Sequence, residues 1–332
     1  MKPVPAKLGH GAVLVIGLAV AFGYPAVADL YAVIQLTNAA ALALFALSLA
    51  LVWGFGGILC FGQAAFFGLG GYAYAIAAIN FADTTLAVPI AILVPTAFAA
   101  ALGYFMFYGR LNDVYMGVVT LTVTLILFKL ANSTSGPNYR IGDARLGGFN
   151  GIPATPPLNR PFDPATLLTP EQILTVAVLV LLAGYFLCAW LLGRRFGRVM
   201  VAIRENELRA ALLGIDVRRH KLITFAIGGG LAGAAGMLFA QNVLVSPTLF
   251  SLLYTVQVII WVIVGGLGTL IGPILGSVGM QYLMAWLGAQ AWVNTDLALG
   301  AILIGFVVLV PRGLWPPIRN FGARALDRLW RR

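Results

Sequence analysis

The chain alternates long apolar runs with shorter polar connections. Most runs are about 20 residues long, and a helix of that length crosses a hydrocarbon core of roughly 30 Å. They lack the two-residue alternation of a transmembrane β-barrel. The pattern therefore predicts an all-α, polytopic transmembrane helical bundle. We expect ten apolar segments, at about residues 11–28, 32–52, 53–75, 86–107, 113–130, 172–192, 222–242, 252–271, 273–287 and 297–310.

Two of these segments are unusually rich in glycine. Residues 53–75 contain seven glycines, and residues 265–276 contain five. Small residues let membrane helices pack closely, as the four-residue spacing of Gly229 and Gly233 also suggests. Glycine-rich backbone can also unwind where protein or water satisfies its polar groups. Tight packing and broken or re-entrant segments beside a translocation path are both open. The predicted number of membrane segments is therefore about 8–10.

The first run has two interpretations. Lys2 and Lys7 precede it and Pro25-Ala26-Val27-Ala28 follows it, which is typical of a signal peptide with a small-residue cleavage site. Further apolar runs follow at once, so we favour an uncleaved first span.

The longest polar interval is the stretch 132–171, here called the proline-rich loop. It contains seven of the 17 prolines of the chain. Proline removes hydrogen bonds from helix and strand interiors, so an irregular loop with short elements is predicted. Loops of this length are usually functional or disordered.

Residues 193–221, here called the charged segment, differ from everything around them. We predict one helix from Arg198 to Leu213, ended by Gly214 as the C′ residue. Asp216 is then placed to cap a second helix that begins near Val217 and enters the membrane. Such a segment is either a docking helix for a protein partner or an amphipathic connector on the lipid surface.

Charge sets the expected orientation. The net charge is +10, and its excess gathers in the charged segment and in the basic tail 312–332. The positive-inside rule explains this better than nucleic-acid binding and puts both stretches in the cytoplasm. Six predicted spans precede the charged segment and four follow it. Both termini are then cytoplasmic, and the proline-rich loop is extracytoplasmic.

The sequence contains few candidates for catalysis or metal binding. It has no G-x-x-x-x-G-K-[ST] motif, two histidines at basic membrane boundaries, and two cysteines in apolar runs. We therefore expect no P-loop ATPase site, no catalytic triad, no metal and no cofactor bound by this chain. The spans also lack the ladder of ionisable groups common in proton- or sodium-driven carriers. Transport energised by another subunit is the favoured function.

Five stretches resemble one transporter family when taken together in order. They are AIRENELRAALLGIDV (202–217), FGQAAFFGLGGYA (61–73), LITFAIGGGLAGAAGMLFA (222–240), GGLGTLIGPILGS (265–277) and LVPRGL (309–314). This combination resembles LivM-type permeases of bacterial ABC importers, the branched-chain amino acid and amide/urea group. The resemblance covers most of the chain and implies that residues 1–332 form a single transmembrane permease domain.

The resemblance also implies partners. They are a homologous LivH-like permease, two ATPase subunits that bind ATP-Mg, and an extracytoplasmic binding protein, all at the bacterial inner membrane. It makes the charged segment the ATPase-coupling element, with candidate residues Arg204, Glu205, Asn206, Glu207, Ala210, Ala211 and Gly214. The importer-wide EAA-x-x-x-G pattern places its glutamate where this chain has Leu208, so Glu207 is offset by one position.

Candidate residues of the translocation path are uncharged polar groups inside apolar runs: Gln63, Thr120, Thr124, Gln241 and Gln257. The alternative for each is a hydrogen bond between packed helices. Branched-chain amino acids are the favoured substrates, with urea or short amides as the alternative. An ATP-independent channel or facilitator is the rival of a different class, because it too lacks charge in the membrane.

Overall fold

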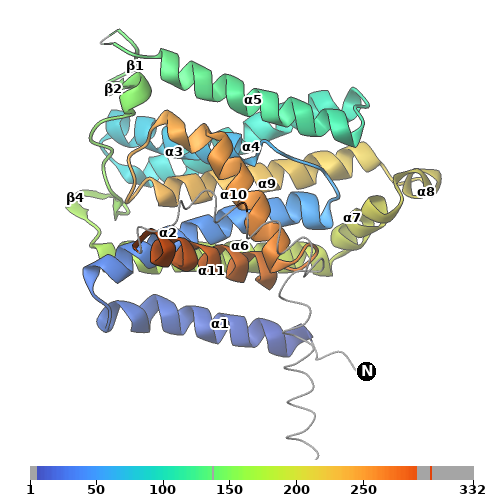
Figure 1. The fold of residues 1–332 in the computed structure, drawn as a ribbon, viewed down its shortest axis with the longest axis horizontal. Coiled ribbons are helices and arrows are strands. Elements are labelled where there is room, and N and C mark those ends of the chain that lie inside the picture. The colour runs from blue at the N-terminus through green and yellow to red at the C-terminus, as the bar shows by residue number, and fades with distance from the viewer. Residues whose placement is uncertain (1–5, 137, 290–299, 301–332) are drawn as a thin grey trace, which may run out of the picture.

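The fold is a bundle of long helices, described by a computed structural model over residues 6–136, 138–289 and 300 (Figure 1). The helices are α1 (Ala6–Gly23), α2 (Leu30–Leu49), α3 (Gln63–Phe81), α4 (Thr84–Tyr108), α5 (Asp113–Ser133), α6 (Pro170–Gly193), α7 (Arg195–Glu205), α8 (Glu207–Leu212), α9 (Val217–Phe239), α10 (Leu252–Gly265) and α11 (Ile271–Ala289). The predicted all-α polytopic bundle is confirmed.

The predicted spans are found close to their expected positions. Six helices are long and apolar enough to cross a membrane, and two shorter apolar helices lie at His10–Ala26 and Leu252–Gly265. Helix α11 occupies the segment predicted at 273–287. The basic tail 312–332 lies outside the described residues, as does nearly all of the span predicted at 297–310.

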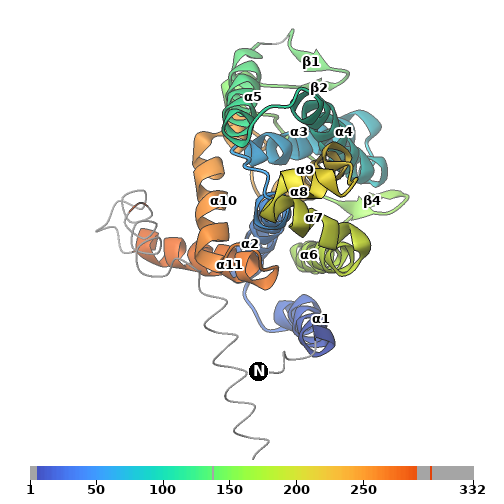
Figure 2. The same cartoon turned by 90° about the vertical axis from the view of Figure 1, so that its right-hand side faces the viewer.

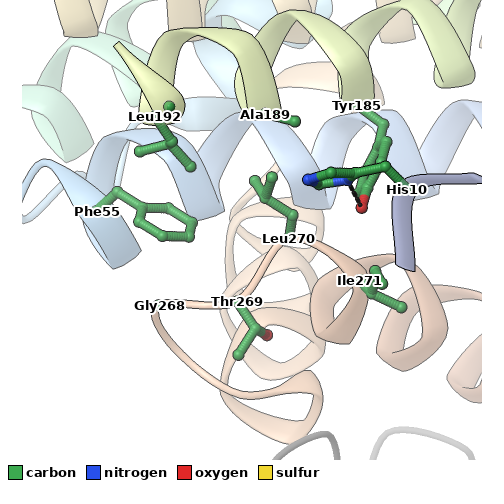
Figure 3. A pocket seen from close by; sticks show the side chains of 10 residues that line it. His10, Phe55, Tyr185, Ala189, Leu192, Gly268, Thr269, Leu270 and Ile271 are labelled. Atoms are coloured by element: carbon green, nitrogen blue, oxygen red, sulfur yellow. Dashed lines mark hydrogen bonds between the residues drawn. The ribbon is translucent and has the colours of Figure 1, made fainter. Parts of the chain in front are cut away.

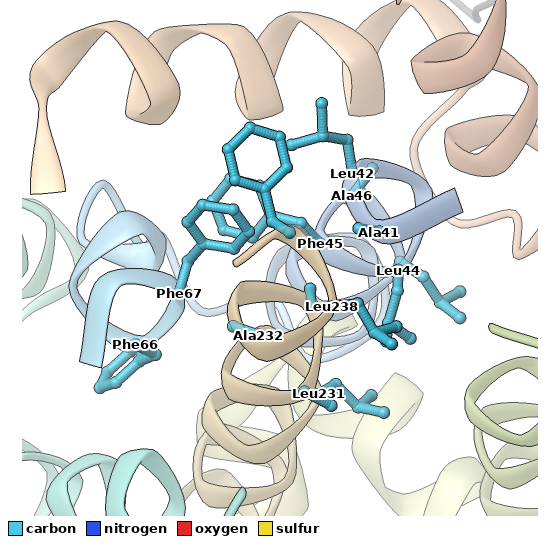
Figure 4. Packing of buried hydrophobic residues seen from close by; sticks show 14 of the residues in the cluster. Ala41, Leu42, Leu44, Phe45, Ala46, Phe66, Phe67, Leu231, Ala232 and Leu238 are labelled. Atoms are coloured by element: carbon cyan, nitrogen blue, oxygen red, sulfur yellow. The ribbon is translucent and has the colours of Figure 1, made fainter. Parts of the chain in front are cut away.

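Helix α9 occupies the centre of the bundle and packs against α2, α3 and α4. Figure 4 shows Leu231, Ala232 and Leu238 of this helix beside buried side chains of α2 and α3, including Phe45 and Phe67. Glycines make the closest approaches possible. A Cβ on Gly233 would lie 2.5 Å from Pro95 Cγ of α4, so the predicted small-residue packing is confirmed there.

Two of the membrane segments are interrupted, as one interpretation of their glycines predicted. Helix α2 ends in a π-helical turn, η2 (Ala50–Phe55), and α3 begins only at Gln63. Helix α10 ends at Gly265, and positive φ angles at Gly266 and Gly268 separate it from α11. Figure 2 shows α10 running across the direction of the long helices of the bundle. Glycine adopts these φ values without steric cost, which is why the breaks fall where they do.

The proline-rich loop is irregular, as predicted, with two short antiparallel strand pairs. Strand β1 (Arg140–Ile141) pairs with β2 (Ala144–Arg145), with Arg140 opposite Arg145. Strand β3 (Asn159–Arg160) pairs with β4 (Asp163–Leu167) across an irregular register. A 3-10 turn covers Gly148–Asn150.

The two polar regions lie at opposite ends of the bundle. In Figure 1 the strands of the proline-rich loop are at the left end, whereas α7 and α8 are at the right. Helix α1 begins at the α7–α8 end. This relative arrangement agrees with the predicted topology.

Candidate functional site

The charged segment contains two short helices, so the prediction of one helix from Arg198 to Leu213 is wrong. Asn206 has φ −160° and ψ 102°, an extended conformation that separates α7 from α8. Its side-chain oxygen accepts a hydrogen bond from the backbone N–H of Arg209 at 2.8 Å. Asparagine competes in this way with helical hydrogen bonding, and here it ends one helix and caps the next.

Both ends of the charged segment have non-helical joints. Arg194 is extended between α6 and α7. Gly214 has φ +80° after α8, and the Asp216 carboxylate accepts a hydrogen bond from the Arg219 N–H at 3.1 Å at the start of α9. The predicted C′ glycine and N-cap are therefore confirmed.

A small apolar cluster joins α7, α8 and α9. Its buried members are Ile203, Ala210 and Val217, one from each helix. Ala210 is therefore a packing residue, whereas Ala211 next to it is exposed. Helix α8 and its C-cap also expose three leucines: Leu208 (71%), Leu212 (80%) and Leu213 (76%).

Four charged residues of the segment contact the membrane helices or one another. The Arg204 guanidinium donates to the Gly54 carbonyl at 2.6 Å and to the Glu205 carboxylate at 2.6 Å. The Glu207 carboxylate accepts from the Lys221 ammonium at 2.5 Å. Lys221 is only 8% exposed, and its ammonium also lies 3.9 Å from the carboxylate of Asp113, the first residue of α5.

Gln63 is buried rather than exposed to a path within this chain. Only 1% of its surface is accessible. Its amide nitrogen donates to the Ser48 hydroxyl at 2.8 Å and to the Gly228 carbonyl at 3.2 Å. Its amide oxygen accepts from the Cys60 thiol at 3.6 Å. The geometry favours the helix-packing interpretation, and it places the start of α3 beside the interior of α2 and α9.

Thr120 and Thr124 lie beside the same break. The Thr120 hydroxyl accepts from the Phe61 N–H at 3.2 Å and donates to the Gly117 carbonyl at 3.0 Å. The Thr124 hydroxyl donates to the Thr120 carbonyl at 2.9 Å. Both threonines are buried. The structure therefore brings Gln63 and Thr120 together around the start of α3.

Gln241 and Gln257 are elsewhere. The Gln241 amide oxygen accepts from the Leu158 N–H at 2.9 Å, which ties the proline-rich loop to the chain just after α9. Gln257 is half-buried on α10. Their role in a path stays a prediction.

A cavity of about 350 Å³ lies beside the α10–α11 break (Figure 3). Its lining includes Phe55 of η2, Leu270, and His10 of α1, whose Nδ1 is 2.9 Å from the Tyr185 hydroxyl. None of the predicted path residues lines it. Within the described ranges, no group of three His, Cys, Asp or Glu residues is arranged to hold a metal ion.

Sequence reasoning missed Gly54, Asp113 and Lys221 as members of this site. Gly54 contributes a backbone carbonyl, which side-chain patterns do not reveal. Lys221 follows Arg218, Arg219 and His220 at the end of a basic run, so no signal in the sequence set it apart. Its proximity to Asp113 depends on the packing of α5 against the rest of the bundle.

Known proteins match this chain over most of its length. A family model described as "Branched-chain amino acid transport system / permease component" matches residues 31–310. The branched-chain amino acid permease LivM of Escherichia coli K12 is 29% identical over 292 residues, covering 82% of this chain and 67% of that protein. The Salmonella typhimurium LivM is 29% identical over 290 residues, with the same coverage.

A shorter match involves a different transport system. The autoinducer 2 import permease LsrC of Klebsiella pneumoniae is 32% identical over 140 residues, or 39% of each chain. No solved structure matches the chain.

Proposed function

This chain belongs to the family of branched-chain amino acid transport system permease components, and we propose that it is the transmembrane subunit of an ATP-driven importer. The charged segment carries this proposal. It is a jointed pair of helices at one end of a multi-pass membrane protein, with exposed leucines on its outer side. A passive channel has no need of such an element.

The exposed leucines of α8 support the assignment of a protein partner. Leu208 and Leu212 lie on α8 and Leu213 is its C-cap. The helix also carries Glu207 and Arg209, so these leucines are apolar groups in a polar setting. Clustered exposed apolar side chains with a polar rim are typical of protein interfaces. We assign this surface to an ATPase subunit, and Arg204, Glu205, Asn206, Glu207, Ala210, Ala211 and Gly214 to the coupling element around it.

The remaining partners follow from the same proposal. Two ATPase subunits bind ATP-Mg, a LivH-like permease completes the membrane part, and a binding protein delivers substrate at the proline-rich loop. This chain contributes no ATPase site and no cofactor. Residues 1–332 act as one permease domain of the bacterial inner membrane, with both termini and the tail 312–332 in the cytoplasm.

Transport then occurs by alternating access, as ATPase closure moves the charged segment against the bundle. We place the path at the interface with the second permease, where Gln257 remains the candidate lining residue on α10. Gln63, Thr120 and Thr124 hold the start of α3 in position. Branched-chain amino acids are the proposed substrates because both LivM relatives carry that name. Urea or a short amide is the alternative.

Reconstituted vesicles test the proposal. The complex with its binding protein should accumulate radiolabelled leucine only when ATP is present on the ATPase side. Leu208→Asp/Leu212→Asp should abolish both uptake and co-purification of the ATPase, because it places charge in the apolar contact. Ala202→Asp, which adds charge at an exposed position of α7 outside this surface, is the matched control.

Two outcomes would contradict it. Leucine entry without ATP, unaffected by the double aspartate variant, would indicate a facilitator. Uptake of labelled urea or acetamide in place of leucine would move the chain to the amide alternative.

A further inference from the structure

Arg204 lies where three separated parts of the chain meet. It belongs to the last turn of α7, and its guanidinium reaches the Gly54 carbonyl in η2. The same guanidinium is 3.5 Å from the position that a Cβ on Gly268 would occupy, in the connection between α10 and α11. One side chain of the charged segment therefore bonds to the first break, at η2, and lies beside the second, between α10 and α11.

Glycine is needed on every side of this junction. A Cβ on Gly57, which has φ +68°, would lie 2.7 Å from Arg204 Cγ and 3.3 Å from its Cα. A Cβ on Gly54 would lie 3.1 Å from the backbone nitrogen of Gly268. The first contact is too close for a Cβ, and the second would force its backbone neighbour to shift. The glycines thus let the backbones of the two breaks and of α7 come together around one arginine.

The bond between Arg204 and Gly54 suits a mechanical link. The Gly54 carbonyl is in the last turn of the helix formed by α2 and η2, where carbonyls lack helical partners and a cation is favourable. A hydrogen bond from a charged donor is stronger than a neutral one. The other terminal nitrogen of the guanidinium, Nη2, donates to the Glu205 carboxylate, and this second bond orients the guanidinium.

The other connections of the charged segment lead to different places. Its covalent ends pass through the extended Arg194 and through Gly214. The Glu207–Lys221 pair reaches the beginnings of α5 and α9. Within the part of the chain that the structure describes, Arg204 provides the side-chain hydrogen bond from the charged segment to the η2 break.

Space for movement lies next to the junction. The 350 Å³ cavity of Figure 3 is lined by Phe55 of η2 and by residues of the α10–α11 connection, Gly268 to Leu270. Packed interiors resist displacement, whereas an adjoining cavity lets a connection shift without overlapping its neighbours. The two breaks can therefore move together when Arg204 moves.

We propose that Arg204 transmits movement of the charged segment to the two helix breaks, and that this link couples ATP hydrolysis to opening of the path. Arg204 is a positioning residue that contacts neither substrate nor nucleotide. This inference rests on the proposed function and adds the residue that connects the ATPase side to the membrane interior.

The test measures ATP hydrolysed per leucine imported by the reconstituted full complex. Arg204→Ala should lower uptake roughly tenfold, the effect of losing one charge-assisted hydrogen bond, while ATP hydrolysis and ATPase co-purification stay near native values. Arg204→Lys keeps the charge but loses the fork, so it should recover part of the coupling. Arg198→Ala, an exposed arginine of α7, is the matched control and should behave like the native chain.

The outcomes separate this inference from the function on which it rests. A native complex that imports leucine without ATP contradicts the proposed function itself. If the native complex needs ATP but Arg204→Ala keeps the native ratio of ATP hydrolysed to leucine imported, the proposed function stands and the role of Arg204 is overturned. Parallel loss of hydrolysis and uptake in both Arg204 variants would also overturn it, because Arg204 would then serve ATPase docking or folding.

Discussion

The proline-rich loop and the charged segment are both long polar stretches, yet they are attached to the bundle in opposite ways. The loop is held by hydrogen bonds between side chains and backbone. The Asn80 amide bonds Asp143 N–H and the Ile141 carbonyl, and the Tyr74 hydroxyl donates to the Pro156 carbonyl at 2.9 Å. The charged segment has non-helical joints at both ends. It is held by ion pairs, by one small apolar cluster and by Met200 of α7, which is buried in the main core.

Asn159 shows the difference most clearly. It is buried, and it bonds the Thr84 N–H and hydroxyl, the Asp83 carboxylate and its own strand. Buried hydrogen bonds of this kind are lost only at high cost. We therefore expect the loop to stay fixed on the bundle, as a cover, and the charged segment to move relative to the bundle. The predictions below test that contrast, beginning with the largest effect.

Removing the loop anchor should destabilise the protein most. Asn159→Ala removes the acceptor of the Thr84 N–H and of the Thr84 hydroxyl, although the Asn159 N–H still donates to that hydroxyl, so we expect a loss of about 3 kcal/mol in unfolding free energy. Thermal unfolding of the purified protein in detergent measures it. Asn150→Ala, an exposed asparagine of the same loop, should have almost no effect. Equal stability of both variants would show that the loop is not fixed by Asn159.

Breaking the ion pair of the charged segment should have a smaller effect. Glu207→Gln leaves the buried Lys221 ammonium with only Asp113 nearby, and we expect a loss of roughly 1–2 kcal/mol. Glu207→Gln/Lys221→Met should recover most of it, because the buried charge is then gone. Chemical denaturation compares the two. If the double variant is no more stable than the single one, the charge of Lys221 is not the cause.

The joint after α8 should depend on glycine. Gly214→Ala forces a Cβ into a backbone with φ +80° and should cost about 1 kcal/mol, although open space surrounds the site. Gly193→Ala is the control, since Gly193 also faces open space but needs no positive φ. Hydrogen exchange of α8 reports the difference. Equal exchange in both variants would show that the joint does not need glycine.

Acid should loosen the loop slightly. Hydrogen bonds from the Thr85 N–H and from the Asn159 and Thr85 side chains hold the pKa of the half-buried Asp83 carboxyl below its usual value. The carboxylate therefore adds stability above its unfolded-state pKa, and this contribution is lost as the pH falls through its folded-state pKa. The melting temperature of Asp83→Asn should be lower than that of the native chain at neutral pH and equal to it in strong acid. A constant difference would contradict this.

Local sequence signals predicted much of this structure, whereas contacts between distant residues could not be predicted. The spans were predicted from the length of the apolar runs. The joint between α8 and α9 was predicted from Gly214 and Asp216, because each of these residues determines the conformation of the backbone next to it. Asn206 carried a similar local signal, but the good helix formers around it favoured one continuous helix. The bond from Arg204 to Gly54 joins residues 150 positions apart. Only the packing of α7 against η2 creates it, so no sequence pattern indicated it.

The most direct test compares the movement of the charged segment with that of the proline-rich loop, at opposite ends of the bundle. Spin labels at Arg198→Cys and Leu179→Cys report the distance between the charged segment and α6. Labels at Phe149→Cys and Leu179→Cys report the distance between the proline-rich loop and α6. Cys60 and Cys188 are buried, and the unsubstituted chain controls for their labelling. We predict that trapping the full complex with ATP shifts the first distance and leaves the second unchanged. An unchanged first distance, or an equal shift in both, would contradict the central claim that the charged segment moves against a bundle with a fixed cover.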